Sequence, residues 1–184
     1  RETLIKRGHT VDLYERREIG GSIVPGSKPK IKYELDNYLT YLYNVVEKLK
    51  ANPDFTFIKG NAQAESLKAK SYDAILVATG TKQLKPKING LDTAKVHFAI
   101  EVLKNPSLVR DARTIIVLGG GVVGAETAYF LKYELNKDVK LIEMDKYIMK
   151  NACTANRGHI IHYLEEAGVD MLHLDVMDGI FVPN

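Results

Sequence analysis

The sequence has little of what builds disulfide-bonded, metal-binding or membrane proteins. One cysteine, Cys153, stands among 184 residues. A single thiol excludes an internal disulfide, a zinc cluster made of thiolates and an iron–sulfur site ligated within this chain. We therefore expect a reducing, cytoplasmic setting. The longest apolar run, residues 115–125, contains four glycines and is about half of the ~20 residues that a membrane span needs. No membrane partner is expected.

An excess of charge of one sign is also lacking. The chain carries 26 Lys plus Arg against 23 Asp plus Glu, a formal net charge of +3, which is too small to indicate a nucleic acid partner. Its 45% hydrophobic and 27% charged residues are typical of globular proteins. The sequence begins RETLIKRG, without an initiator methionine or the apolar core of a signal peptide. We expect a piece of a longer functional unit that can bury a core of its own.

Segments with the patterns of strands and helices alternate along the chain. Strands are expected at residues 10–15, 55–58, 73–78, 114–118, 139–143 and 170–176, and helices at 31–49, 96–103, 122–135 and 154–167. The segment DAILVA at 73–78 is continuously apolar and therefore predicts a buried strand. The alternation predicts an α/β protein with Rossmann-like parallel sheets.

The strongest motif is TIIVLGGGVVGAETAYFL, in which Gly119, Gly121 and Gly124 form GxGxxG between an apolar strand and a helix. The first glycine permits a tight turn, the second lets the backbone approach a pyrophosphate, and the third allows the helix to pack closely on the strand. The phosphates would bind at the N-terminus of the helix. Glycine-rich turns also occur in α/β proteins that bind no dinucleotide, so the motif needs support from its surroundings.

An acid at the end of the next strand gives that support. Glu143 lies 24 residues after Gly119, and dinucleotide-binding folds place an acid about 20 residues further on to accept hydrogen bonds from a ribose hydroxyl. A carboxylate would repel the 2′-phosphate of NADP, so Glu143 favours NAD. Lys146 lies close enough in sequence to leave this preference open.

An earlier part of the chain has the second half of the same pattern. Glu15 closes a predicted strand, Gly20 and Gly21 follow it, and the segment AILVATG ends at Thr79 and Gly80 before the GxGxxG motif. This order resembles that of flavoproteins in which an NAD domain interrupts an FAD domain. Within that group, residues 1–169 look most similar to the C-terminal FAD/NAD region of enoate reductases and 2,4-dienoyl-CoA reductases, relatives of old yellow enzyme.

The resemblance implies an NADH:flavin oxidoreductase, in which NADH passes a hydride to FAD. In its first half, Glu15 would accept from the FAD ribose, Gly20 and Gly21 would let the backbone approach the cofactor, and Thr79 with Gly80 would line its phosphate side.

In the second half, the resemblance implies that NAD is held by the three motif glycines and Glu143, with Glu126 following the glycines as in that group. No side chain is expected to act as a catalytic acid or base, because the cofactors supply the chemistry and the protein orients them.

Full enzymes of the group pass electrons through an iron–sulfur cluster to FMN in a TIM barrel, where an activated C=C bond is reduced. The first GxGxxG, the barrel and the cluster cysteines do not occur in this sequence. We therefore expect the TIM-barrel flavin domain as a missing partner, and FAD binding that is weak or absent in this chain. The predicted domains are a partial FAD-binding domain at 1–108, an NAD-binding Rossmann domain at 109–169 and a tail at 170–184.

The tail resembles a different family. Its sequence, DMLHLDVMDGIFVPN, matches the HxDxMDGxFVPN pattern of ribulose-phosphate 3-epimerase, and this resemblance implies that His173 and Asp175 bind a divalent metal. One strand of an eight-stranded barrel cannot hold a catalytic metal by itself. The alternatives to an oxidoreductase fragment are therefore a fusion with a sugar-phosphate isomerase and an inactive gene remnant.

Overall fold

The computed structural model describes residues 2–92 and 95–173. These residues fold as two compact units, one made of 2–28 with 32–86 and the other of 29–31 with 87–92 and 95–173. The units divide near residue 86, whereas the sequence places the limit between the FAD and NAD domains at residue 108. The assignment of a cofactor to each domain stays a prediction.

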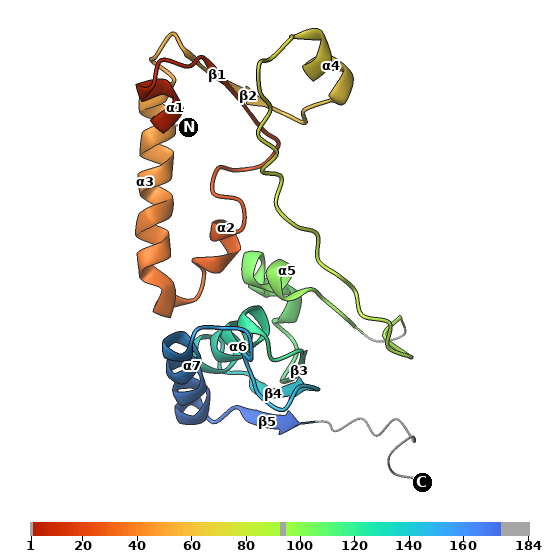
Figure 1. Cartoon of the computed structure of the whole chain (residues 1–184). Helices are drawn as coiled ribbons and strands as arrows, with labels where there is room; N and C mark the ends of the chain where they lie inside the picture. Colours follow the sequence, from red (N-terminus) through yellow and green to blue (C-terminus); the bar gives the residue numbers. More distant parts are fainter. Residues whose placement is uncertain (1, 93–94, 174–184) are drawn as a thin grey trace. The chain divides into compact units, whose positions relative to one another are not determined.

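The first unit is built around two parallel strands and one long helix (Figure 1). Strand β1 pairs with β2 in a register that runs from Val11 opposite Phe55 to Glu15 opposite Lys59. The elements are α1 (Glu2–Lys6), β1 (Val11–Glu15), α2 (Ile23–Gly26), α3 (Tyr33–Leu49), β2 (Phe55–Lys59) and α4 (Ala64–Ala69). The 3-10 turn η1 (Lys30–Lys32) precedes α3 in the chain, and its first two residues belong to the second unit. The strands expected at 10–15 and 55–58 and the long helix expected at 31–49 are confirmed within two residues.

Polar contacts attach residues 70–72 to β1. The Asp12 carboxylate accepts a hydrogen bond from the Tyr72 hydroxyl and pairs with Lys70 at 3.0 Å. The Tyr72 and Tyr14 hydroxyls lie 3.2 Å apart, and the Lys70 ammonium lies over both rings. The Tyr72 and Lys70 hydrogen bonds lower the pKa of Asp12, while burial and the contact with Asp12 raise the pKa of Tyr72 to about 12. The segment after α4 is therefore fastened to the sheet.

The prediction of a buried strand at 73–78 is wrong. Residues 74–88 run as irregular chain without strand pairing (Figure 1). Leu76 and Val77 are 79% and 81% exposed. A strand needs a neighbour for its backbone hydrogen bonds, and within the described residues β1 and β2 pair only with each other. The apolar pattern indicates that the segment could be buried in a sheet. It does not indicate whether a partner strand is present.

The second unit is a three-stranded parallel sheet in the order β3-β4-β5, with helices α6 and α7 packed together (Figure 1). Its elements are α5 (Ala99–Lys104), the 3-10 turn η2 (Pro106–Val109), β3 (Thr114–Leu118), α6 (Val122–Tyr129), the π-helical turn η3 (Phe130–Glu134), β4 (Asp138–Glu143), α7 (Thr154–Ala167) and β5 (Asp170–His173). Rossmann-like parallel α/β architecture, the predicted fold class, is confirmed.

The core of this unit lies between the sheet and its helices. Val139 and Leu141 of β4 are fully buried, as are Ala125 and Ala128 of α6 and Leu164 of α7. The two alanines let α6 approach the strands closely, because a small side chain adds little distance at the contact. Burial on alternate positions of β4 matches the two-residue period of a strand.

Strand β5 changes the interpretation of the tail. The epimerase resemblance treats residues 170–184 as foreign to the nucleotide fold, yet Asp170–His173 pairs with β4 as the third parallel strand of the same sheet. Met171, Leu172 and His173 lie opposite Leu141, Ile142 and Glu143. Asp175 lies outside the described residues. No helix in the described part of the chain is long and apolar enough to cross a membrane.

Burial predicts a large difference between two leucines. Leu141→Ala removes a side chain with no exposed surface and should lower the free energy of unfolding by roughly 2–5 kcal/mol, because it leaves a cavity. Leu76→Ala, at a 79% exposed position, should change it by less than about 0.5 kcal/mol. Urea unfolding of both variants and the parent chain measures this, and equal losses would contradict the fold described for the two segments.

Candidate dinucleotide-binding site

The glycine motif forms the junction between β3 and α6. Gly119 has a φ of +96°, a left-handed conformation that favours glycine, and its N–H donates to the Ile142 carbonyl at 2.8 Å. A Cβ on Gly124 would collide with the Gly119 carbonyl oxygen. The two glycines therefore play the predicted parts: one turns the chain, and the other lets the first turn of α6 rest on that turn.

Gly121 faces open space. A Cβ at this position would meet no atom within 4 Å, and the residue lines a cavity of about 150 Å³. It is the N-cap of α6, and its carbonyl accepts the Ala125 N–H at 2.9 Å. The N–H groups of the first turn, which have no partner within a helix, begin at this residue. A phosphate placed here would meet backbone donors without a side chain in the way, so the residues fit the phosphates of a dinucleotide.

Glu143 is held against the glycine loop by two backbone groups. Its Oε2 accepts the Gly120 N–H at 2.6 Å, and its Oε1 accepts the Asp145 N–H at 2.7 Å. Two oxygens of a carboxylate can accept about four hydrogen bonds, so both retain capacity for ribose hydroxyls. Glu143 also lines the cavity. The predicted acid and the predicted glycines therefore share one site.

Gly120 is a residue of the candidate site that the motif does not mark. It occupies a variable position of GxGxxG, yet it is buried, and a Cβ there would lie 3.0 Å from the Glu143 Cβ and 3.1 Å from Oε2. Its carbonyl accepts the Met149 N–H at 2.7 Å. Both of its polar groups are thus used to close the site. The run of three glycines at 119–121 was the available signal.

The loop after β4 forms the other wall of the cavity. Its lining residues are Asp145, Tyr147 and those at 149–152. Lys150 pairs with Asp145 at 2.7 Å, and the hydrogen bond and charge of Asp145 raise the pKa of Lys150. Lys146, the cation singled out by the sequence, lies 5.3 Å from the centroid of the Tyr147 ring. Lys150 therefore stands in the wall of the cavity where the sequence suggested Lys146.

Two other candidate residues do not line this cavity. Glu126 is half-buried on α6, after the glycines. His173 ends β5, and its Nδ1 lies 3.1 Å from the Asp145 carbonyl oxygen. Three or more His, Cys, Asp or Glu side chains arranged for a metal ion do not occur within 2–92 and 95–173.

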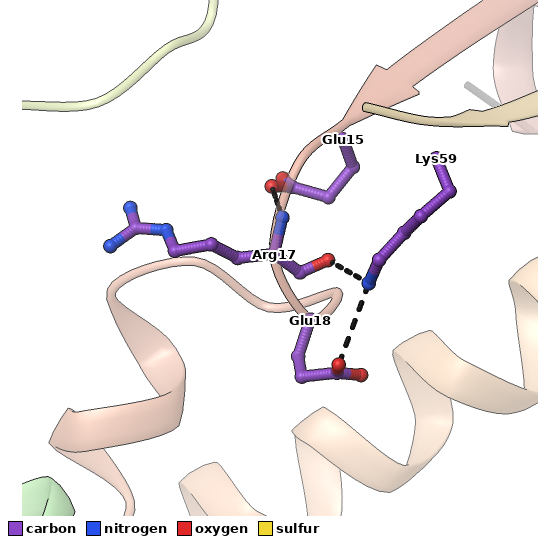
Figure 2. A network of polar contacts seen from close by, with 4 residues as sticks. All are labelled: Glu15, Arg17, Glu18 and Lys59. Atoms are coloured by element: carbon purple, nitrogen blue, oxygen red, sulfur yellow. Dashed lines mark hydrogen bonds and ion pairs between the residues drawn. The ribbon is translucent and has the colours of Figure 1, made fainter. Parts of the chain in front are cut away.

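The candidate FAD residues of the first unit do not form a comparable cradle. Glu15 accepts the Arg17 N–H at 2.8 Å, and Lys59 donates to the Arg17 carbonyl at 2.6 Å while pairing with Glu18 at 3.4 Å (Figure 2). This network uses the end of β1 to fix the turn that follows. A Cβ on Gly20 would collide with Leu39 of α3, so this glycine serves packing.

Gly21 alone of that pair faces open space, with a φ of +53°. Thr79 and Gly80 are exposed on the irregular segment, and among the described residues they make no hydrogen bond with Glu15, Gly20 or Gly21. The structure therefore brings Glu15, Gly20 and Gly21 to one turn and leaves Thr79 and Gly80 outside it. These residues do not fit FAD as a complete site.

The sheet, the glycine loop and the anchored acid define a dinucleotide-binding protein of the Rossmann class. The sequence matches the family described as pyridine nucleotide-disulphide oxidoreductase over residues 3–180, and the chain belongs to this family of flavin- and NAD(P)-dependent oxidoreductases.

Similar proteins agree with this membership. The chain is 32% identical over 167 residues to bilirubin reductase of Mediterraneibacter gnavus and 33% identical over 171 residues to cinnamate reductase of Clostridium sporogenes, each match covering 90% of this chain. The matches cover 25% and 24% of those relatives, so the chain spans about a quarter of their length.

Two solved structures share the fold. The amine oxidase that acts on 6-hydroxypseudooxynicotine, from Pseudomonas geniculata, aligns with a TM-score of 0.71 at 20% identity, over 93% of this chain and 27% of its own. The HOCl-induced flavoprotein disulfide reductase of Escherichia coli aligns with a TM-score of 0.61 at 19% identity, over 93% of this chain and 45% of its own.

A methyl group on Gly120 should loosen the site. Gly120→Ala places a Cβ against Glu143, so the carboxylate must move, and NADH should bind about tenfold more weakly, which corresponds to about 1.4 kcal/mol. Gly158→Ala is the matched control, because a Cβ on that helical glycine meets nothing within 4 Å. It should keep the affinity and gain roughly 0.5–1 kcal/mol of stability. Fluorescence titration and urea unfolding measure both, and undiminished NADH binding by a folded Gly120→Ala chain would refute the close contact.

Proposed function

We propose that this chain is the NADH-binding part of an NADH-dependent flavin oxidoreductase. The observation that carries the proposal is the anchored Glu143 carboxylate, which faces the same cavity as the open side of Gly121. An acid at this place selects a ribose with free hydroxyls, and the start of α6 supplies donors for the pyrophosphate. When bound, NADH supplies a hydride.

The residues of this chain bind and orient that cofactor. Gly119 and Gly124 fix the turn, Gly121 keeps the phosphate side open, and Glu143 aligns the adenosine half. The half-buried Glu126 follows on α6, one turn into the helix from the phosphate position. None of these groups needs to gain or lose a proton during hydride transfer, which the cofactors carry out between themselves.

The acceptor side belongs to the longer protein. Bilirubin reductase and cinnamate reductase are both named for reduction of a conjugated compound, and this supports an activated C=C bond as the final acceptor, as in enoate reductases. In such a protein, FAD, an iron–sulfur cluster and FMN in a TIM-barrel domain would carry the electrons onward. Glu15, Gly20, Gly21, Thr79 and Gly80 would contribute to FAD binding only together with residues from outside this chain.

Titration with the two nicotinamide cofactors tests the proposal. The parent chain should bind NADH at least about tenfold more tightly than NADPH, because the Glu143 carboxylate repels a 2′-phosphate. Glu143→Ala should weaken NADH binding about tenfold and reduce the difference between the cofactors. Glu165→Ala, an exposed position on α7, controls for the loss of a surface charge and should match the parent. Absence of binding by both cofactors would end the proposal, and equal binding would end the preference for NAD.

Reconstitution with FAD gives an independent test. Because the first unit offers no phosphate cradle among its described residues, the chain should show no stoichiometric flavin absorbance after incubation with FAD and removal of free cofactor. Refolding in the presence of FAD should give the same result. A stable yellow complex with one FAD per chain would show that the first unit binds FAD without further segments.

A further inference from the structure

The cavity beside the glycine loop holds one lysine, and that lysine is paired. Lys150 and Asp145 both line the cavity together with Glu143, and the Lys150 Nζ lies 2.7 Å from the Asp145 Oδ1. Asp145 is itself tied to Glu143, since its N–H donates to the Glu143 Oε1. The three charged side chains of the wall therefore form one connected group.

Two nearby cations do not line the cavity themselves but lie against Tyr147, a residue of its wall. The Lys146 ammonium and the Arg157 guanidinium lie 5.3 and 5.0 Å from the centroid of the Tyr147 ring. Arg157 also donates from Nε to the Ile148 carbonyl at 2.9 Å. Among the residues that line the cavity, Lys150 is the lysine, and its ammonium is paired with Asp145.

The sum of charges in the wall is unfavourable for a second phosphate. Glu143 and Asp145 carry two negative charges and Lys150 carries one positive charge, so the wall is negative by one. A phosphomonoester carries about −1.5 to −2 at neutral pH. Neutralising Asp145 would bring the net charge of the wall to zero and free the Lys150 ammonium from its ion pair. A lysine ammonium is a common binder of phosphate.

We propose that Asp145 is a specificity-determining residue of the adenosine half-site, because its ion pair with Lys150 denies the 2′-phosphate of NADPH a cation. The inference rests on the proposed function, since it assigns a role to a neighbour of Glu143 in the same cavity. Selection for NADH is therefore shared: Glu143 receives the free ribose hydroxyls, and Asp145 keeps the adjacent lysine occupied.

Two small probes isolate this half-site. Adenosine 5′-monophosphate and adenosine 2′,5′-bisphosphate differ only in the 2′-phosphate, and isothermal titration gives the affinity of each. Asp145→Asn should strengthen binding of the bisphosphate at least about tenfold and change binding of the monophosphate by less than about twofold. The gain should shrink as salt is raised, because an exposed charge contact is screened.

Removal of the lysine provides the second arm. Lys150→Gln alone should not strengthen binding of the bisphosphate. The double variant Asp145→Asn with Lys150→Gln should lose the stronger bisphosphate binding that Asp145→Asn alone shows. Asp170→Asn, at the start of β5, changes the net charge equally away from the cavity and should resemble the parent chain. The Asp145–Lys150 pair is exposed, with side-chain accessibilities of 50% and 56%, so all variants should keep the unfolding midpoint of the parent.

The outcomes separate this inference from the proposed function. If the parent chain binds NADH and the monophosphate but Asp145→Asn gains nothing for the bisphosphate, the role of Asp145 is wrong and the NADH site stands. A gain of equal size in Asp170→Asn, or one that persists without Lys150, overturns the inference as well. Failure of the parent chain to bind NADH or the monophosphate overturns the proposed function together with the inference.

Discussion

The close approach of α6 to the end of β3 is the constraint on which the second unit depends. Gly124 has no side chain to hold the helix away from the Gly119 carbonyl, and Ala125 and Ala128 continue the close contact into a fully buried core. On the other side of the loop, the buried Gly120 lies against Glu143, whose Oε2 accepts the Gly120 N–H at 2.6 Å. The glycine loop is therefore in close contact with α6 on one side and with Glu143 on the other, and both contacts leave no room for a side chain.

The second unit could be predicted from the sequence in most respects because its signals are local. The apolar strand at Thr114–Leu118, the glycine turn and the acid at Glu143 each follow from short patterns, and the sheet brings them together. Sequence patterns missed the contact of Gly120 with Glu143, for which the run of three glycines was the only signal, and the Asp145–Lys150 pair, for which there was none. Both contacts depend on the conformation of the loop after β4. The spacing of apolar residues predicts helices and strands, and it does not predict the conformation of a loop.

The first unit shows where local patterns stop being sufficient. Its strands and long helix were predictable, but the apolar segment at 73–78 is exposed and unpaired among the described residues. A strand is a property of two segments, and the pattern of one segment cannot supply the other. Likewise, Gly20 was expected to let the backbone approach a cofactor, yet a Cβ at this glycine would meet the Leu39 side chain, a packing contact that the sequence pattern does not distinguish from cofactor binding.

The position of the one cysteine has a practical consequence. Cys153 is exposed and forms the N-cap of α7, directly after Ala152 in the cavity wall. A thiol-reactive fluorophore would therefore attach at a single place without any change to the sequence. It would stand one residue from the wall of the candidate site, and its emission should change when that cavity fills.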